Sequence, residues 1–189
     1  AANGFACGAA YAEGILALLA AVARPPVARA GFWAITGGRT YPITQEFGRT
    51  DFSTGSGRDN YGYGAAYGLP ADAHPGIDVG TPAGTPLASP VDGVVEIAGG
   101  SGYYRDEDEP GVDPATSGEL RLRRANGDLV ILGHLRRITV RVGQVVRASQ
   151  PVGVSGSANG PHVHVEVRVV DPALASGYRV VDPRAYLGE

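Results

Sequence analysis

A segment near the C-terminus alternates strictly between polar and apolar residues, which favours a β-strand. It reads Pro161-His162-Val163-His164-Val165-Glu166-Val167-Arg168. Because successive side chains in a strand point to opposite faces, the valines share one face and the other carries His162, His164, Glu166 and Arg168. The α-carbons of the two histidines then lie roughly 6 to 7 Å apart, so one imidazole can bind a metal while the other reaches its water. Taken alone, the pattern fits better with two exposed histidines on an edge strand.

Two other short segments carry the remaining histidines. Residues 74–78 read His-Pro-Gly-Ile-Asp, and the proline and glycine favour a turn entering a strand over a helix. An apolar run ends at His134. A His/Asp pair on a loop can form half of a metal site, although Asp78 could equally stabilise the turn and His134 could end a buried strand. All four histidines of the chain lie in these three segments, which favours a shared metal site.

From about Arg39 onward, short β-type runs alternate with Gly, Pro, Asn and Asp, a pattern typical of an all-β domain. We expect strands at 91–97, 119–123, 129–132, 138–142 and 162–170. Two longer segments interrupt this pattern: 50–73 is rich in glycine and tyrosine, and 104–117 is acidic. Loops of this length in a compact domain are usually functional or mobile.

The first 38 residues differ in composition from the rest. Residues 9–23 are rich in alanine and leucine, and two prolines follow, so we expect a helix that ends there. Its apolar part, 15–23, is too short to span a bilayer and lacks the positively charged start of a signal peptide. We therefore predict an N-terminal helical segment or linker at 1–38 and a β domain at 39–189.

Composition excludes several classes of function. The net charge of -3 provides no broad cationic field for a nucleic-acid backbone. All 16 basic side chains are arginines, so mechanisms that need a lysine, such as a Schiff base or a P-loop, are excluded. Cys7 is the only cysteine, so a metal must be bound by histidine and carboxylate.

The three histidine segments, in this order, resemble those of the lysostaphin-type zinc metalloendopeptidases. The family carries a His-x-Gly-x-Asp turn, a Gly-His-Leu strand end, and Gly-Pro-His-x-His followed by an acidic residue; here these lie at 74–78, 133–135 and 160–166. Flanking phrases match as well, at 43–48, 84–86, 92–95, 142–146 and 181–187. The resemblance covers about residues 39–189.

The resemblance implies a mainly β fold, in which antiparallel sheets form a groove with the metal site on its floor. It implies Zn²⁺ as cofactor, with His74, Asp78 and His164 as ligands and with His134 and His162 as the catalytic pair. Two imidazoles and one carboxylate leave the fourth tetrahedral position for water, as in a catalytic zinc site.

By the same resemblance, the chain would hydrolyse peptide bonds in bacterial cell-wall peptidoglycan, as a secreted, envelope-associated or phage-borne enzyme. The alternative is a non-catalytic relative that binds wall material or activates another hydrolase; such relatives usually lose metal ligands, which this chain keeps. A lipoyl- or biotinyl-type carrier, which residues 88–95 resemble, would need a lysine to modify.

The sequence departs from the family pattern in two places. Relatives commonly have a tyrosine two residues before the histidine of the Gly-His-Leu element, where this chain has Leu132. A tyrosine often polarises the scissile carbonyl in relatives, and among Tyr61, Tyr63 and Tyr67 we favour Tyr67. The alternative is that all three only pack against or line the loop before His74. The acidic stretch 105–116 resembles an insertion; we expect it to border the groove and select substrates by charge, and a solvated loop is the alternative.

Overall fold

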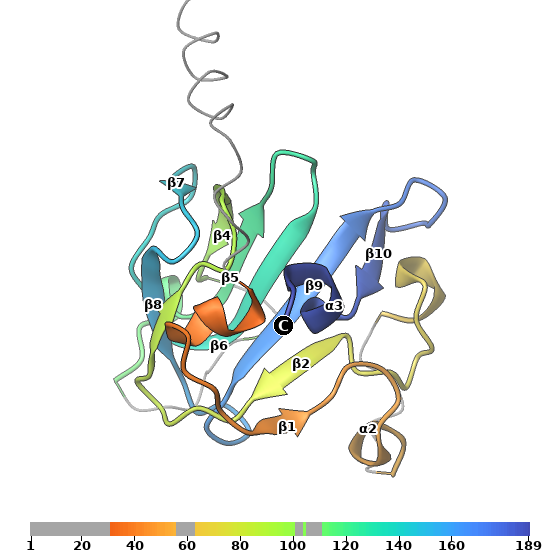
Figure 1. The fold of residues 1–189 in the computed structure, drawn as a ribbon, viewed down its shortest axis with the longest axis horizontal. Coiled ribbons are helices and arrows are strands. Elements are labelled where there is room, and N and C mark those ends of the chain that lie inside the picture. Colours follow the sequence, from red (N-terminus) through yellow and green to blue (C-terminus); the bar gives the residue numbers. More distant parts are fainter. Residues whose placement is uncertain (1–30, 56–62, 101–103, 105–110) are drawn as a thin grey trace, which may run out of the picture.

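The computed structural model describes residues 31–55, 63–100, 104 and 111–189, and in this part of the chain ten strands form one hydrogen-bonded sheet (Figure 1). The strands are β1 (Ile43–Gln45), β2 (Gly76–Val79), β3 (Pro86–Ala88), β4 (Gly93–Ala98), β5 (Gly118–Arg123), β6 (Leu129–Ile138), β7 (Val145–Val146), β8 (Pro151–Ser155), β9 (Val163–Val170) and β10 (Tyr178–Val181). The main path runs β1-β2-β9-β6-β5-β4-β7, while β10 pairs with β9, and β8 pairs with both β6 and β3. Each of these pairings is antiparallel, which confirms the predicted mainly β class.

Helices are short in this part of the chain. They are η1 (Phe32–Thr36), α2 (Asp51–Gly55), η2 (Gly64–Tyr67), η3 (Pro114–Thr116) and α3 (Pro183–Leu187). Within the described ranges, no helix has the length and apolar character needed to cross a membrane. The helix predicted at 9–23 lies outside the described residues.

The hydrophobic core lies on the valine face of β9. Val163, Val165 and Val167 are fully buried there, in one cluster with Phe32 of η1 and Leu187 of α3. In Figure 1, η1 and α3 lie over the middle of the sheet. Burial of each such side chain contributes about 1.5–3 kcal/mol before the entropy cost of ordering it. Since η1 precedes residue 39, the core also includes residues N-terminal to the predicted start of the β domain.

The opposite face of β9 is buried as well, although its side chains are polar. His164, Glu166 and Arg168 are 3%, 0% and 8% exposed, so β9 is covered on both sides. The alternation in sequence therefore separates a core face from a polar interior face. It does not separate buried from exposed side chains.

Three of the five predicted strands are confirmed to within two residues at their ends, the one at 129–132 ends six residues too early, and the one at 138–142 is wrong. β6 continues from Leu129 through His134 to Ile138, and 139–142 form no strand. Those residues lead into a tight turn, in which the Gln144 amide donates to the Arg141 carbonyl at 3.0 Å and Gly143 has a φ of 82°. Val142, whose apolar character suggested a strand, is 64% exposed at this turn.

Candidate metal centre

Two adjacent strands hold the three residues predicted to bind metal. His74 lies just before β2, Asp78 lies on β2, and His164 lies on β9 directly opposite Asp78 in the antiparallel register. Ile77 and Val79 point into the core, so alternation turns Asp78 toward the polar face that also carries His164.

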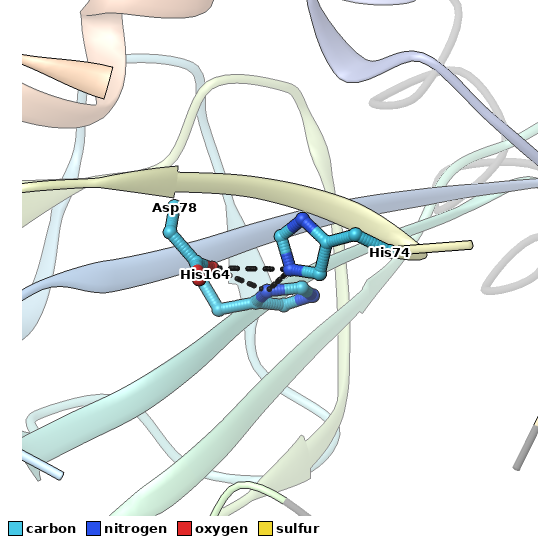
Figure 2. A group of neighbouring side chains, drawn as sticks. All are labelled: His74, Asp78 and His164. Carbon is cyan, nitrogen blue, oxygen red and sulfur yellow. Dashed lines mark hydrogen bonds and ion pairs between the residues drawn. The ribbon is translucent and has the colours of Figure 1, made fainter. Parts of the chain in front are cut away.

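The three candidate ligand atoms lie close to one another (Figure 2). His164 Nδ1 is 2.8 Å from Asp78 Oδ1 and 3.2 Å from His74 Nε2, and the latter two atoms are 3.4 Å apart. Ligand atoms that surround zinc tetrahedrally at about 2.0–2.1 Å are separated by about 3.3 Å. The nitrogen and oxygen donors therefore fit a zinc ion, and three ligands leave one tetrahedral position open.

Hydrogen bonding orients His74 for this role. The His74 Nδ1–H can donate to the Glu46 carbonyl at 3.0 Å, which leaves the Nε2 lone pair facing Asp78 and His164. Such a bond from the second ring nitrogen fixes the tautomer and the ring plane of a ligating histidine.

The electrostatics of the metal-free site favour an ion pair. Burial raises the pKa of Asp78, but hydrogen bonds and charges from His164 and His74 outweigh it and hold the pKa well below its usual range. Burial lowers the pKa of His164, but the carboxylates of Asp78 and Glu166 outweigh it and raise the pKa to about 9. In the absence of metal, the lowered pKa of Asp78 and the raised pKa of His164 therefore favour a carboxylate paired with an imidazolium at neutral pH.

Gly76 allows β2 and β9 to approach closely at the site. A Cβ atom at this position would lie 2.3 Å from the Val165 carbonyl oxygen and 2.6 Å from Cε1 of His164. Since real Cβ atoms essentially never come this close to backbone, a side chain here would separate the two strands that carry Asp78 and His164. The glycine of the His-Pro-Gly-Ile-Asp turn is thus required by packing.

The two predicted catalytic histidines lie beside the three candidate ligands. The His162 Nδ1–H can donate to the Gly160 carbonyl at 2.8 Å, which leaves its Nε2 free to act as a base, 3.8 Å from Asp78 Oδ1. The ring of His134 lies next to it, with a centroid distance of 4.6 Å. The structure therefore brings all five predicted site residues together.

A β-bulge places His134 in this position. In the β5–β6 pairing, Leu132 lies opposite Leu120 and Leu135 opposite Gly118, so β6 has one residue more than β5 between these pairs. His134 takes the extra space with a φ of 60°. Bulges of this kind redirect a side chain, whereas the sequence predicted His134 at a strand end.

A cleft of about 310 Å³ opens over the five residues. Its lining comprises Thr44, Gln45, Phe52, His74, Pro75, Asp78, Tyr104, His134, Asn159, His162 and His164. The candidate ligand histidines, His74 and His164, are almost fully buried, so they lie at its floor. Phe52, at 53% exposure, and Asn159 were not singled out from the sequence.

The tyrosine at the site differs from the one that we favoured. Tyr67 does not line the cleft; its ring packs on that of Tyr63 at a centroid distance of 4.9 Å. Tyr104 lines the cleft instead, although it belongs to the second long loop, in which we looked only for charge. Leu132 is fully buried in the core. The acidic residues at 106–109 lie outside the described ranges, so their proposed selective role stays a prediction.

Glu166, for which the sequence suggested no role, is a buried anion beside the site. Burial raises its pKa, but His164 and Arg168 outweigh that effect and lower the pKa to about 2. Its Oε1 accepts from Arg168 Nε at 2.5 Å, and its Oε2 is 3.7 Å from His164 Nε2.

Known proteins are similar to this chain in sequence and in fold. The DD-carboxypeptidase/endopeptidase Mpg of Neisseria meningitidis is 33% identical over 101 residues, which are 51% of this chain and 20% of that protein. The catalytic domain of the prophage-encoded M23 protein EnpA from Enterococcus faecalis, a point mutant, has a TM-score of 0.53 and 27% identity over 84% of this chain and 100% of its own. The antimicrobial peptidase lysostaphin from Staphylococcus simulans has the same fold, with a TM-score of 0.55 and 24% identity over 84% of this chain and 52% of its own.

A family model matches the part of the chain that holds the site residues. The chain spans only about a fifth of the length of the curated relative. The family model for Peptidase family M23 matches residues 72–176, a range that contains all three candidate ligands and both further histidines. Because this range is more than half of the chain, the chain belongs to peptidase family M23.

Proposed function

We propose that this protein is a zinc-dependent endopeptidase that hydrolyses peptide bonds in bacterial peptidoglycan. One observation carries the proposal: three ligand atoms lie 2.8 to 3.4 Å apart, and two further histidines lie beside them in one cleft. A structural zinc site is closed by four protein ligands, whereas a catalytic site keeps a position for water.

Each of the five residues has a distinct role in this proposal. His74, Asp78 and His164 would hold zinc, which when bound supplies Lewis-acid activation of a water near neutral pH. His162, whose Nε2 carries the free lone pair, accepts a proton from the attacking water. His134, next to it, stabilises the developing oxyanion or protonates the leaving amine.

The edge strand beside the cleft and the name of a relative both support an extended peptide of the cell wall as substrate. β1 is the end strand of the main path, and its Thr44 and Gln45 line the cleft. An extended peptide can bind alongside such a strand through its main chain. The curated relative is described as a DD-carboxypeptidase/endopeptidase, and a protein acting on peptidoglycan would work outside the cell, in the envelope or on a phage particle.

A non-catalytic wall-binding or hydrolase-activating protein is the second candidate. Such a protein would need neither a metal nor a base near it. The present chain retains three ligands in bonding positions and an oriented His162, which favours the enzyme.

Digestion of purified cell walls tests the proposal. Zinc-loaded protein is incubated with peptidoglycan of several cross-link chemistries, and new amine ends are identified by mass spectrometry. The Asp78→Ala variant, expected to lose zinc, is the control. We expect new amine ends with the wild-type protein only; wall binding without new ends at any cross-link would favour the non-catalytic candidate.

A further inference from the structure

A buried polar cluster lies behind the candidate ligand His164, on the side away from Asp78. We call Tyr63, Tyr104, Glu166 and Arg168 the outer cluster. Glu166 Oε2 accepts from the Tyr104 hydroxyl at 2.5 Å and from the Tyr63 hydroxyl at 2.7 Å. Arg168 Nη2 donates to the Tyr63 hydroxyl at 2.8 Å. The cluster joins two long loops of the chain to β9.

The two nitrogens of His164 have different surroundings. Nδ1 faces the other candidate ligands, Asp78 and His74. Nε2 is 3.2 Å from the Tyr104 hydroxyl oxygen, which itself donates to Glu166. A neutral imidazole carries one proton, so a donor bond from Nε2–H to Tyr104 requires that Nδ1 present a lone pair.

Packing holds Tyr104 in place on three sides. Its ring stacks on that of His164 at a centroid distance of 4.8 Å and an angle of 24°, and it meets the ring of His134 edge-on at 5.4 Å. Behind it lies Gly133, where a Cβ atom would come within 2.7 Å of the Tyr104 ring. Tyr104 is only 2% exposed, and its hydroxyl is engaged with Glu166 instead of the cleft.

We infer that Tyr104 is a positioning residue for the metal ligand His164. The Tyr104 hydroxyl accepts a hydrogen bond from His164 Nε2–H and donates a hydrogen bond to Glu166. This relay of two hydrogen bonds selects the tautomer and the ring plane in which His164 Nδ1 faces the metal. The inference rests on the proposed zinc site. Outer partners of ligating histidines typically account for about 10 to 100-fold in metal affinity.

Tyr63 provides a matched comparison within the same cluster. Its hydroxyl donates to the same Glu166 oxygen, but its other contacts are with Tyr104, Arg168 and Tyr67. Tyr63→Phe therefore removes a hydroxyl from the same Glu166 oxygen, and it also removes the neighbour 3.0 Å from the Tyr104 hydroxyl, but it keeps both the Tyr104–His164 and the Tyr104–Glu166 contacts.

The test compares Tyr104→Phe with Tyr63→Phe. Zinc affinity is measured by competition with a chromophoric chelator, and the Nε2–H of His164 is followed by ¹⁵N NMR in zinc-loaded protein. Tyr104→Phe should weaken zinc binding by about 10 to 100-fold and abolish the slowly exchanging Nε2–H signal. Tyr63→Phe should stay close to the wild type in both measurements.

Wild-type zinc content separates the two proposals. A wild-type protein that binds no stoichiometric zinc overturns the proposed function. If the wild type binds zinc, equal losses in the two variants, or no loss in Tyr104→Phe, overturn the role of Tyr104. Should Tyr104→Phe not fold, Glu166→Gln removes the charge at the end of the relay; unchanged zinc affinity and an unchanged Nε2–H signal in that variant would likewise overturn it.

Discussion

The imidazole rings of His134 and His162 lie with their centroids 4.6 Å apart, although one residue belongs to a bulge in β6 and the other immediately precedes β9. Neither is among the three side chains whose ligand atoms converge for metal binding. The five residues share one cleft, but this arrangement predicts that three of them bind the metal and that His134 and His162 act only in catalysis.

Alanine at either of these two histidines should therefore spare the metal and impair the chemistry. We expect His134→Ala and His162→Ala each to retain about one zinc per chain and to lose about 10² to 10⁴-fold in wall hydrolysis. The double variant should lose less than the product of the two, because both act on one reaction step. Elemental analysis and rates of wall lysis check this; loss of zinc in His162→Ala with retention in His164→Ala would reverse the assignment.

Alanine at a ligand position should have the opposite effect. His164→Ala removes the nitrogen that lies 2.8 Å from Asp78 Oδ1 and 3.2 Å from His74 Nε2, so we expect no stoichiometric zinc. The wild type should gain about 2.7 kcal/mol of stability at free zinc 100-fold above its Kd, and this variant should gain none. Thermal melts with and without zinc measure the difference; a zinc-dependent rise in the variant's melting temperature would contradict the ligand set.

Gly133→Ala should destabilise the protein by packing alone. The new Cβ would lie 2.7 Å from the Tyr104 ring and 3.2 Å from Cβ of His164, and overpacking of this kind costs about 1 to 3 kcal/mol. Gly55→Ala is the matched control, because a Cβ atom there meets nothing within 4 Å. Denaturant unfolding of metal-free protein compares the two, and similar stabilities would refute the close contact at Gly133.

The stability of the metal-free protein should fall at alkaline pH. The raised pKa of His164, about 9, exceeds the value of about 6.5 for an unfolded histidine. The folded state binds this proton more tightly, so the stabilisation is complete below about pH 6.5 and is lost as pH rises through about 9. Melting of chelator-treated protein across this window should show the fall. The metal-free His164→Ala variant should lack this loss of stability between about pH 6.5 and 9. If both proteins show the same dependence of melting temperature on pH, His164 is not its cause.

Much of the site could be predicted because it depends on local sequence. The alternation along 162–168 predicted two histidines on one face of a strand. The turn that ends in Asp78 completes the site when the residues that follow it pair with that strand. The register of β2 with β9 then brings Asp78 opposite His164. These relationships follow from strand periodicity and from the resemblance of the motifs.

Other features depend on contacts between distant segments, which periodicity does not encode. The bulge at His134 is defined by its pairing with β5. The adjacent Gly133 is a local signal that is compatible with a bulge but does not specify one. Tyr104 reaches the site from a loop for which the sequence suggested only charge, into space left by Gly133. The burial of Glu166 follows from hydrogen bonds to two loops, so its position on a strand face did not reveal it.

Because β9 is buried on both faces, we expect this strand to tolerate substitution less well than the walls of the cleft do. Any shift of this strand moves Val165 in the core and His164 at the site together, so inherited variation is expected to be rare along it. The cleft walls, where Phe52 and Asn159 project from short connecting elements, carry no comparable double constraint. If the proposed function holds, exchanging the segments that form the cleft walls between relatives should change substrate preference and leave the candidate metal centre unchanged.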